Sequence, residues 1–103
     1  MGLLKSSIAV KENGLVNSHF FSSKCIEWDE ISHVYAEKVD KITYDEIFII
    51  VQAGQEYLSI GEMDDDFRSV EIGLQENLPN FPVDWQSSVE IGVTGARTQI
   101  WSR

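Results

Sequence analysis

The chain has 103 residues and a net charge of −9, with 43% hydrophobic and 24% charged residues, which is the composition of one folded domain. Its single cysteine, Cys25, excludes an intramolecular disulfide. The acidic balance argues against nucleic acid as a partner and against anionic membranes, because both bind through clustered Lys and Arg.

The first part of the chain, residues 1–63, is predicted to form short antiparallel strands. Residues 3–11 have the apolar spacing of a strand, and Asn13-Gly14 then matches the pair typical of a type I′ hairpin turn. We therefore expect a first hairpin into residues 15–21. Further strands are predicted over residues 25–28 and 31–39, and residues 42–44 are predicted to be a short strand or the end of one.

The clearest strand covers residues 46–52, where β-branched and aromatic residues follow one another without interruption. We expect it to be central in its sheet and well buried. Ala53-Gly54-Gln55 then predicts a turn, and residues 57–60 return with Leu58 and Ile60 on one face. This pattern predicts a second hairpin.

A helix is predicted over residues 64–78, before Pro79. Asp64 is expected at its N-cap, with Asp65 and Asp66 in the first turn, where carboxylates complement free backbone N–H groups. Gly73 indicates a close contact between helix and sheet. Four residues at spacings of three and four form the apolar stripe that should pack on the sheet: Phe67, Val70, Leu74 and Leu78.

Residues 79–103 are expected to form a C-terminal extension that packs on the domain. Val89, Ile91 and Val93 alternate at period two, and residues 98–102 could return as a strand, so we predict a terminal β-hairpin. Three tryptophans are expected in the core or at its margin, although anchoring a partner is the alternative: Trp28, Trp85 and Trp101.

These elements predict one α+β domain over residues 1–103: a curled antiparallel sheet or partial β-barrel of about six strands, capped by one helix. Residues 26–34, Ile-Glu-Trp-Asp-Glu-Ile-Ser-His-Val, followed by the strands at 47–51 and 57–60 and the helix at 67–78, resemble the pleckstrin-homology-like (PH-like) domains of many bacterial proteins. The resemblance implies an adaptor for lipids, peptides or proteins. The first hairpin offers Lys11 beside Glu12, not the several basic residues of phosphoinositide-binding members, so phosphoinositide binding is not expected.

Two possible chemical sites are weak in this sequence. Cys25 and His33 could imitate a thiolate–imidazole pair but lack a positioned third group. Acidic residues from Glu62 to Asp66 offer oxygen ligands without the spacing and glycine of an EF-hand loop. We therefore predict no catalytic residue, no metal site and no cofactor.

The leading hypothesis is a non-enzymatic, cytoplasmic protein-binding module. Its edge strands and its acidic second half are the expected contact surfaces for a protein partner, and a second copy of the chain could pair through an edge strand. The alternative is an acidic inhibitor or immunity-type protein that neutralises a basic partner. The short apolar runs do not predict a membrane span. The acidic interaction surface would consist of Asp45, Glu46, Glu56, Glu62, Asp64, Asp65 and Asp66.

Overall fold

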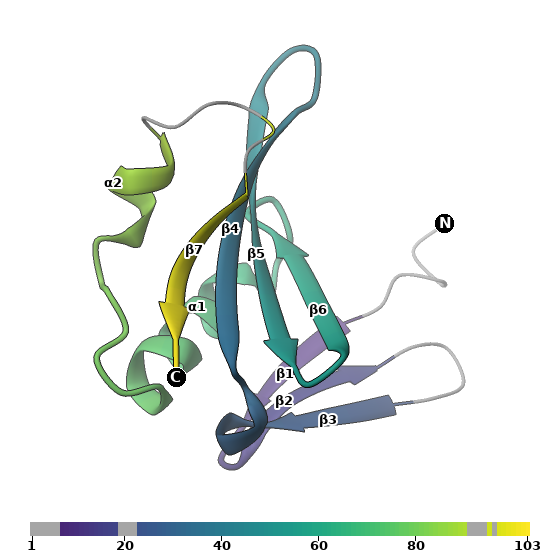
Figure 1. Cartoon of the computed structure of the whole chain (residues 1–103). Helices are drawn as coiled ribbons and strands as arrows, with labels where there is room; N and C mark the ends of the chain where they lie inside the picture. The colour runs from purple at the N-terminus through teal and green to yellow at the C-terminus, as the bar shows by residue number, and fades with distance from the viewer. Residues whose placement is uncertain (1–6, 19–22, 91–94, 96) are drawn as a thin grey trace.

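The computed structural model describes residues 7–18, 23–90, 95 and 97–103 (Figure 1). Within them it contains strands, two α-helices and one short 3-10 helix, η2. In chain order these are β1 (Ser7–Lys11), β2 (Gly14–Ser18), β3 (Ser23–Glu27), η2 (Trp28–Glu30), β4 (His33–Asp40), β5 (Asp45–Ala53), β6 (Glu56–Gly61), α1 (Phe67–Asn77), α2 (Trp85–Glu90) and β7 (Arg97–Ser102).

The strands form two antiparallel sheets, ordered β1-β2-β3 and β6-β5-β4-β7. The α+β class is confirmed, whereas the prediction of one curled sheet or partial barrel is wrong. The physical reason lies between β3 and β4, where η2 interrupts the extended chain and the two strands do not pair. The Arg103 side chain fixes this corner by donating hydrogen bonds to the carbonyl oxygens of Trp28 and Ile31.

The first hairpin is confirmed, but its turn lies one residue earlier than predicted. Lys11 pairs with Gly14, so the two-residue loop is Glu12-Asn13, and neither Asn13 nor Gly14 has a positive φ. Gly14 is needed for space instead: a Cβ there would lie 2.2 Å from the Ile26 carbonyl oxygen. The Trp28 indole N–H also donates a hydrogen bond to the Glu12 carbonyl, which connects this turn to η2.

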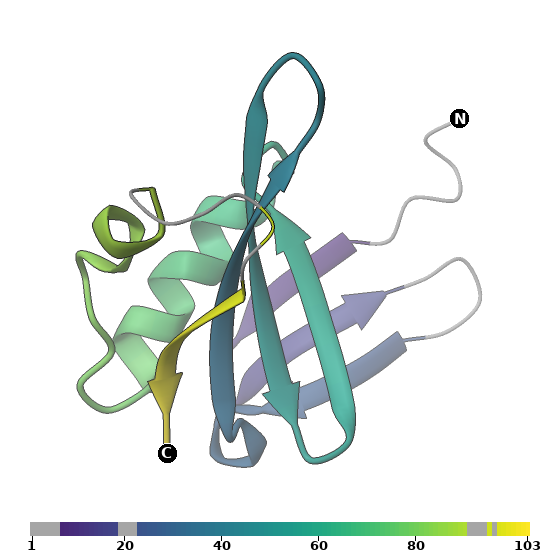
Figure 2. The same cartoon turned by 45° about the horizontal axis from the view of Figure 1, so that its top comes forward.

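One hydrophobic core joins the inner faces of both sheets to the helices. Figure 2 shows how these sheets and helices are arranged. The predicted stripe of α1 is buried in it, and so are all three tryptophans. Gly73 does mark a close contact, because a Cβ there would lie 2.9 Å from Val10 Cγ1 and 3.0 Å from the Trp28 ring. The tryptophans therefore serve packing rather than an exposed anchor.

Helix α1 begins at Phe67, three residues later than predicted, and Asp64 is not its N-cap. Asp64 Oδ1 accepts from the Asp66 N–H, which holds the chain in a turn before the helix. The Asp66 carboxylate accepts from the Ile8 N–H of β1 instead of capping the helix. Asp66 thereby joins the start of α1 to β1 of the first sheet.

The C-terminal extension packs on the domain, but not as a hairpin. Residues 85–90 form α2, since Trp85 and Val89 are one helical turn apart and both are buried; residues 91–94 lie outside the described residues. The predicted strand at 98–102 is confirmed as part of β7, which pairs antiparallel with β4. The final strand thus completes the four-stranded sheet.

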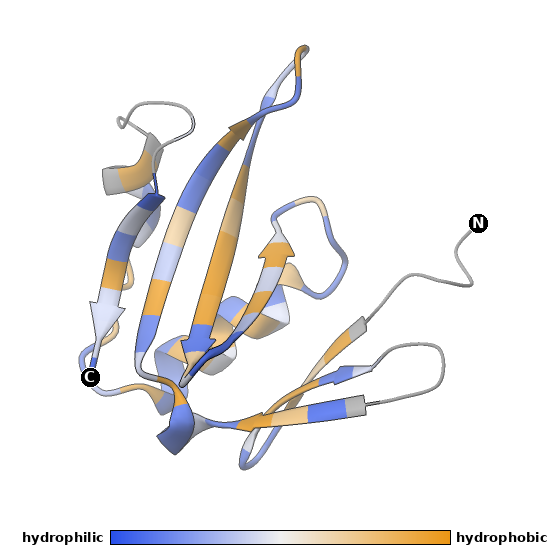
Figure 3. Cartoon of the chain, turned by 45° about the vertical axis from the view of Figure 1, so that its right-hand side comes forward, coloured by the Kyte–Doolittle hydropathy of each residue, from blue (hydrophilic) through white to orange (hydrophobic). Residues whose placement is uncertain are grey.

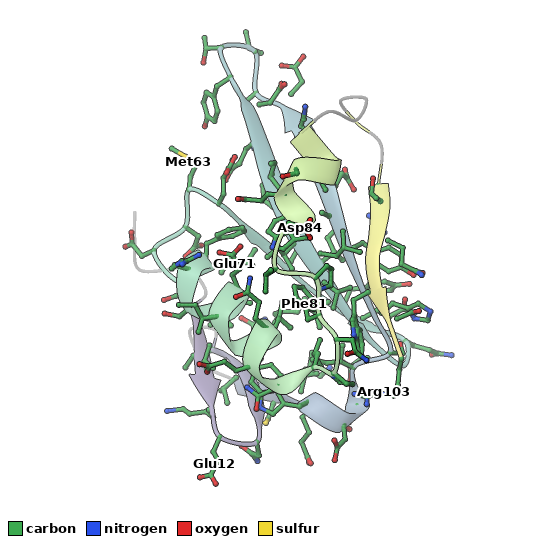
Figure 4. The ribbon with its side chains drawn as sticks, turned by 90° about the vertical axis from the view of Figure 1, so that its left-hand side faces the viewer. Glu12, Met63, Glu71, Phe81, Asp84 and Arg103 are labelled. Carbon is green, nitrogen blue, oxygen red and sulfur yellow. The ribbon has the colours of Figure 1, made fainter. Side chains whose placement is uncertain are left out.

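A buried carboxylate links the two helices (Figure 4). Glu71 of α1 accepts from the Trp85 indole through Oε2 at 3.0 Å and from Arg68 through Oε1 at 2.8 Å. Because the Trp85 side chain is buried, Glu71 supplies an acceptor that water cannot replace.

We expect Glu71→Ala to lower the free energy of unfolding by about 2–3 kcal/mol, because the Trp85 N–H would lose its partner inside the core. Glu71→Gln keeps an oxygen acceptor and should cost less. Urea unfolding followed by tryptophan fluorescence measures both. The exposed Glu76→Ala is the control, expected within about 0.5 kcal/mol of the parent; equal effects of Glu71→Ala and Glu76→Ala would contradict the role of the buried link.

Gly14→Ala should destabilise the chain by about 2–3 kcal/mol, because the added methyl group meets the backbone of β3, which cannot rotate away. Thermal unfolding followed by circular dichroism measures the change. The control is Ser59→Ala, at an exposed position of a strand, which should change the free energy of unfolding by less than about 0.5 kcal/mol. A Gly14→Ala variant as stable as the parent would show that β2 and β3 are not this close.

Candidate functional site: the outer face of the four-stranded sheet

Strand β5 divides the four-stranded sheet into a core-facing side and an outer side. Ile47, Ile49 and Val51 point into the hydrophobic core. The intervening residues, among them Phe48 and Ile50, point to the outer side, because side chains alternate along a strand. Ile50 is buried, yet it lies outside the core cluster, so the outer side has an apolar floor of its own.

An open groove of about 460 Å³ lies on this outer side. Its apolar part comes from three adjacent strands, and Lys41 and Arg97 are its cations. Lys41 Nζ lies 5.4 Å from the centre of the Phe48 ring, while Arg97 pairs with Glu37 and lies over Tyr35. The lining residues are Glu37, Val39, Lys41, Phe48, Ile50, Tyr57, Ser59 and Arg97; we call this surface the outer groove.

Glu46 lies on the outer side of the sheet, at the end next to the β4–β5 hairpin turn. It is only 7% exposed, its Oε2 accepts from the Met63 N–H at 3.2 Å, and its Oε1 lies 3.9 Å from Lys41 Nζ. Gly61 leaves the space for this carboxylate, since a Cβ there would lie 2.3 Å from Glu46 Oε2 and 2.8 Å from the Phe48 ring. Glu46 therefore attaches the turn after β6 to the β4–β5 hairpin.

Beyond Glu46, the β4–β5 hairpin projects past the rest of the molecule (Figures 1 and 3). Its end is not the predicted strand at 42–44 but a tight turn, in which the Thr43 N–H bonds to the Lys41 carbonyl. This turn places Ile42 at φ 77°, a conformation that costs a β-branched residue about 1–3 kcal/mol. Ile42 is nevertheless 95% exposed, so no packing compensates for the strain.

The structure separates the acidic residues that the sequence grouped into one surface. Glu56 lies at the β5–β6 turn, where it pairs with Lys24 of β3. Glu46 is buried, and Glu62 accepts from the Ile47 N–H. Asp45, Glu62, Asp64 and Asp65 remain together near the projecting hairpin and the turn after β6.

The sequence-based chemical candidates do not assemble in this fold. Cys25 is an exposed residue of β3 in the first sheet. His33 belongs to β4 in the second sheet, where its ring stacks on Tyr35 and its Nδ1 lies 3.0 Å from Ser32 Oγ. Within the described part of the chain, no group of three or more His, Cys, Asp or Glu side chains converges as a metal site.

The outer groove was not predicted from the sequence, although a signal for it was present. A strand with one solvated face alternates apolar and polar residues, whereas residues 47–51 are apolar at every position. The uninterrupted apolar run predicts a central, well-buried strand and does not by itself indicate a groove. In the structure one side is the core and the other is the groove.

Comparison of the chain with protein-family models, with curated proteins and with solved structures gives no match. Among the described residues, no helix is both long and apolar enough to cross a membrane.

We expect Glu46→Ala to lower the free energy of unfolding by about 1–2 kcal/mol, because the hydrogen bond from the Met63 N–H to the buried Glu46 carboxylate is lost and a void remains. Hydrogen exchange at the Met63 amide should become faster. Asp65→Ala, at an exposed position of the adjoining turn, is the control and should stay within about 0.5 kcal/mol of the parent. Unchanged exchange at Met63 would show that Glu46 does not attach the turn to the hairpin.

Proposed function

We propose that this chain is a non-enzymatic protein-binding module whose contact surface is the outer groove. The observation that carries the proposal is the apolar floor on the outer side of a sheet whose other side is already packed. Tyr57 is 58% exposed beside this floor, and partly exposed aromatic residues are common binding anchors. An apolar segment of a partner would bury the remaining surface of Phe48 and Val39.

The relation to PH-like domains is part of this proposal. Six strands before α1, and a helix packed on the core, support it. The two separate sheets and the strand β7 that follows the helices are departures from the expected arrangement. A cytoplasmic location belongs to the same proposal and fits the single, exposed cysteine.

The second candidate function is the acidic inhibitor that neutralises a basic partner. Its support is the group of carboxylates near the projecting hairpin, including the exposed Asp45 and Asp65. Both candidates bind a protein and catalyse no reaction; they differ in whether apolar contact or charge supplies most of the binding affinity.

Site-directed photo-crosslinking tests the protein-binding function. The photoreactive residue p-benzoylphenylalanine would replace Tyr57 at the groove, or Val83 as a control that is 76% exposed between α1 and α2. We expect irradiation in the host's cells to give a discrete protein adduct from position 57 and none from position 83. No adduct at position 57 would contradict the proposed contact surface.

The crosslinked protein would then be purified and its affinity for the full chain measured by calorimetry. We expect Tyr57→Ala to weaken binding by about tenfold or more, because an aromatic anchor is removed from a desolvated contact. Val83→Ala should change the affinity by less than about twofold. Equal affinities for the two variants would overturn the assignment of the groove.

A further inference from the structure

We propose that the projecting β4–β5 hairpin is the anchor of the interface and that the partner is a basic protein with an apolar pocket for Ile42 and Tyr44. This inference rests on the proposed protein-binding function and extends it to the chemistry of the partner. It concerns the hairpin tip, which we define as residues 40–45, together with the adjoining turn at 61–66.

The apolar anchors of the tip are uncovered. Ile42 is 95% exposed, Tyr44 is 49% exposed, and Met63 of the adjoining turn is 68% exposed. Glu46 holds Met63 beside the hairpin, and Figure 4 shows the Met63 side chain directed away from the body of the molecule. Large apolar side chains gathered at a projecting end are typical of an interface that a partner covers.

The surroundings of these anchors determine the charge of the partner. The hairpin tip and the adjoining turn, residues 40–45 and 61–66, contain six carboxylates and one lysine, which gives this end a net charge of −5. A negative net charge beside the apolar anchors repels anionic lipid and nucleic acid and attracts a basic surface. Charge complementarity therefore favours a basic protein over the other macromolecules that an apolar tip could meet.

The outer groove and the tip form one continuous contact surface. Lys41 belongs to the tip, and its ammonium group lies over Phe48 of the groove. A partner seated on Ile42 and Tyr44 can thus extend along the sheet to Tyr57. The backbone strain at Ile42 fits this role, because the side chain contributes no packing within the described chain while an interface can bury it.

Photo-crosslinking from the tip tests the inference. With p-benzoylphenylalanine at position 44, we expect an adduct with a protein of positive net charge, which the Val83 control does not form. An adduct from position 57 without one from position 44 would overturn this inference and leave the proposed function standing. No adduct from either position would overturn both, and a partner without positive net charge would overturn the inference alone.

Two variants of the full chain then separate anchoring from folding. Ile42→Gly relieves the positive φ, so the Tm should stay the same or rise, while affinity for the purified partner should fall by about tenfold or more. The matched control is Val83→Gly, because Val83 is also an exposed apolar residue outside the helices and strands. It should change the affinity by less than about twofold. Unchanged affinity of Ile42→Gly would overturn the anchoring role.

Charge is tested separately. Asp64→Asn with Asp65→Asn keeps the Oδ1 acceptor for Asp66 and should slow association by about threefold or more, with a loss that shrinks as salt rises. Asp29→Asn with Glu76→Gln removes the same charge elsewhere and should change the rate less. Equal slowing by the two pairs would overturn the role of the carboxylates beside the hairpin tip. Binding to phosphatidylcholine vesicles that Ile42→Gly abolishes would instead assign the tip to a lipid surface.

Discussion

The structure depends on strand β5, which is apolar on both of its faces. Its inner residues, such as Ile49, form the floor of the core on which the helices pack, while Ile50 is buried on the opposite side. Strand β4 pairs with it over residues 45–52 and strand β6 over residues 48–53. Because burial of apolar area is the main favourable term in folding, this strand both stabilises the domain and leaves apolar surface outside the core.

Polar side chains connect the parts that β5 does not reach. Asp66 bonds to the backbone of β1, Glu71 to the indole of Trp85, and Arg103 to the carbonyls at the corner between the sheets. Each joins segments far apart in the sequence and satisfies backbone or indole groups that would otherwise be costly to bury. Part of the acidity of this chain is therefore structural.

The difference between side chains that hold the fold together and side chains that are exposed also explains the proposed interface. Carboxylates such as Glu46 are buried or bonded to backbone N–H groups, and they fix the projecting hairpin and the turn beside it. Ile42, by contrast, is exposed and held in a strained conformation. A rigid support with uncovered apolar residues at its end is the arrangement expected of a binding module, since a preorganised surface loses little entropy on association.

The local elements could be predicted from the sequence: the central strand, its hairpin with β6, the apolar stripe of α1 and the close contact at Gly73. These follow from periodicity and turn residues over short distances. Tertiary contacts set the separation into two sheets, the helix at 85–90, the role of Asp66 and the outer groove. Those features depend on contacts between segments that are far apart in the sequence. One example is Trp85, which is buried in the core and donates a hydrogen bond to Glu71. Local sequence patterns carry no information about such pairings.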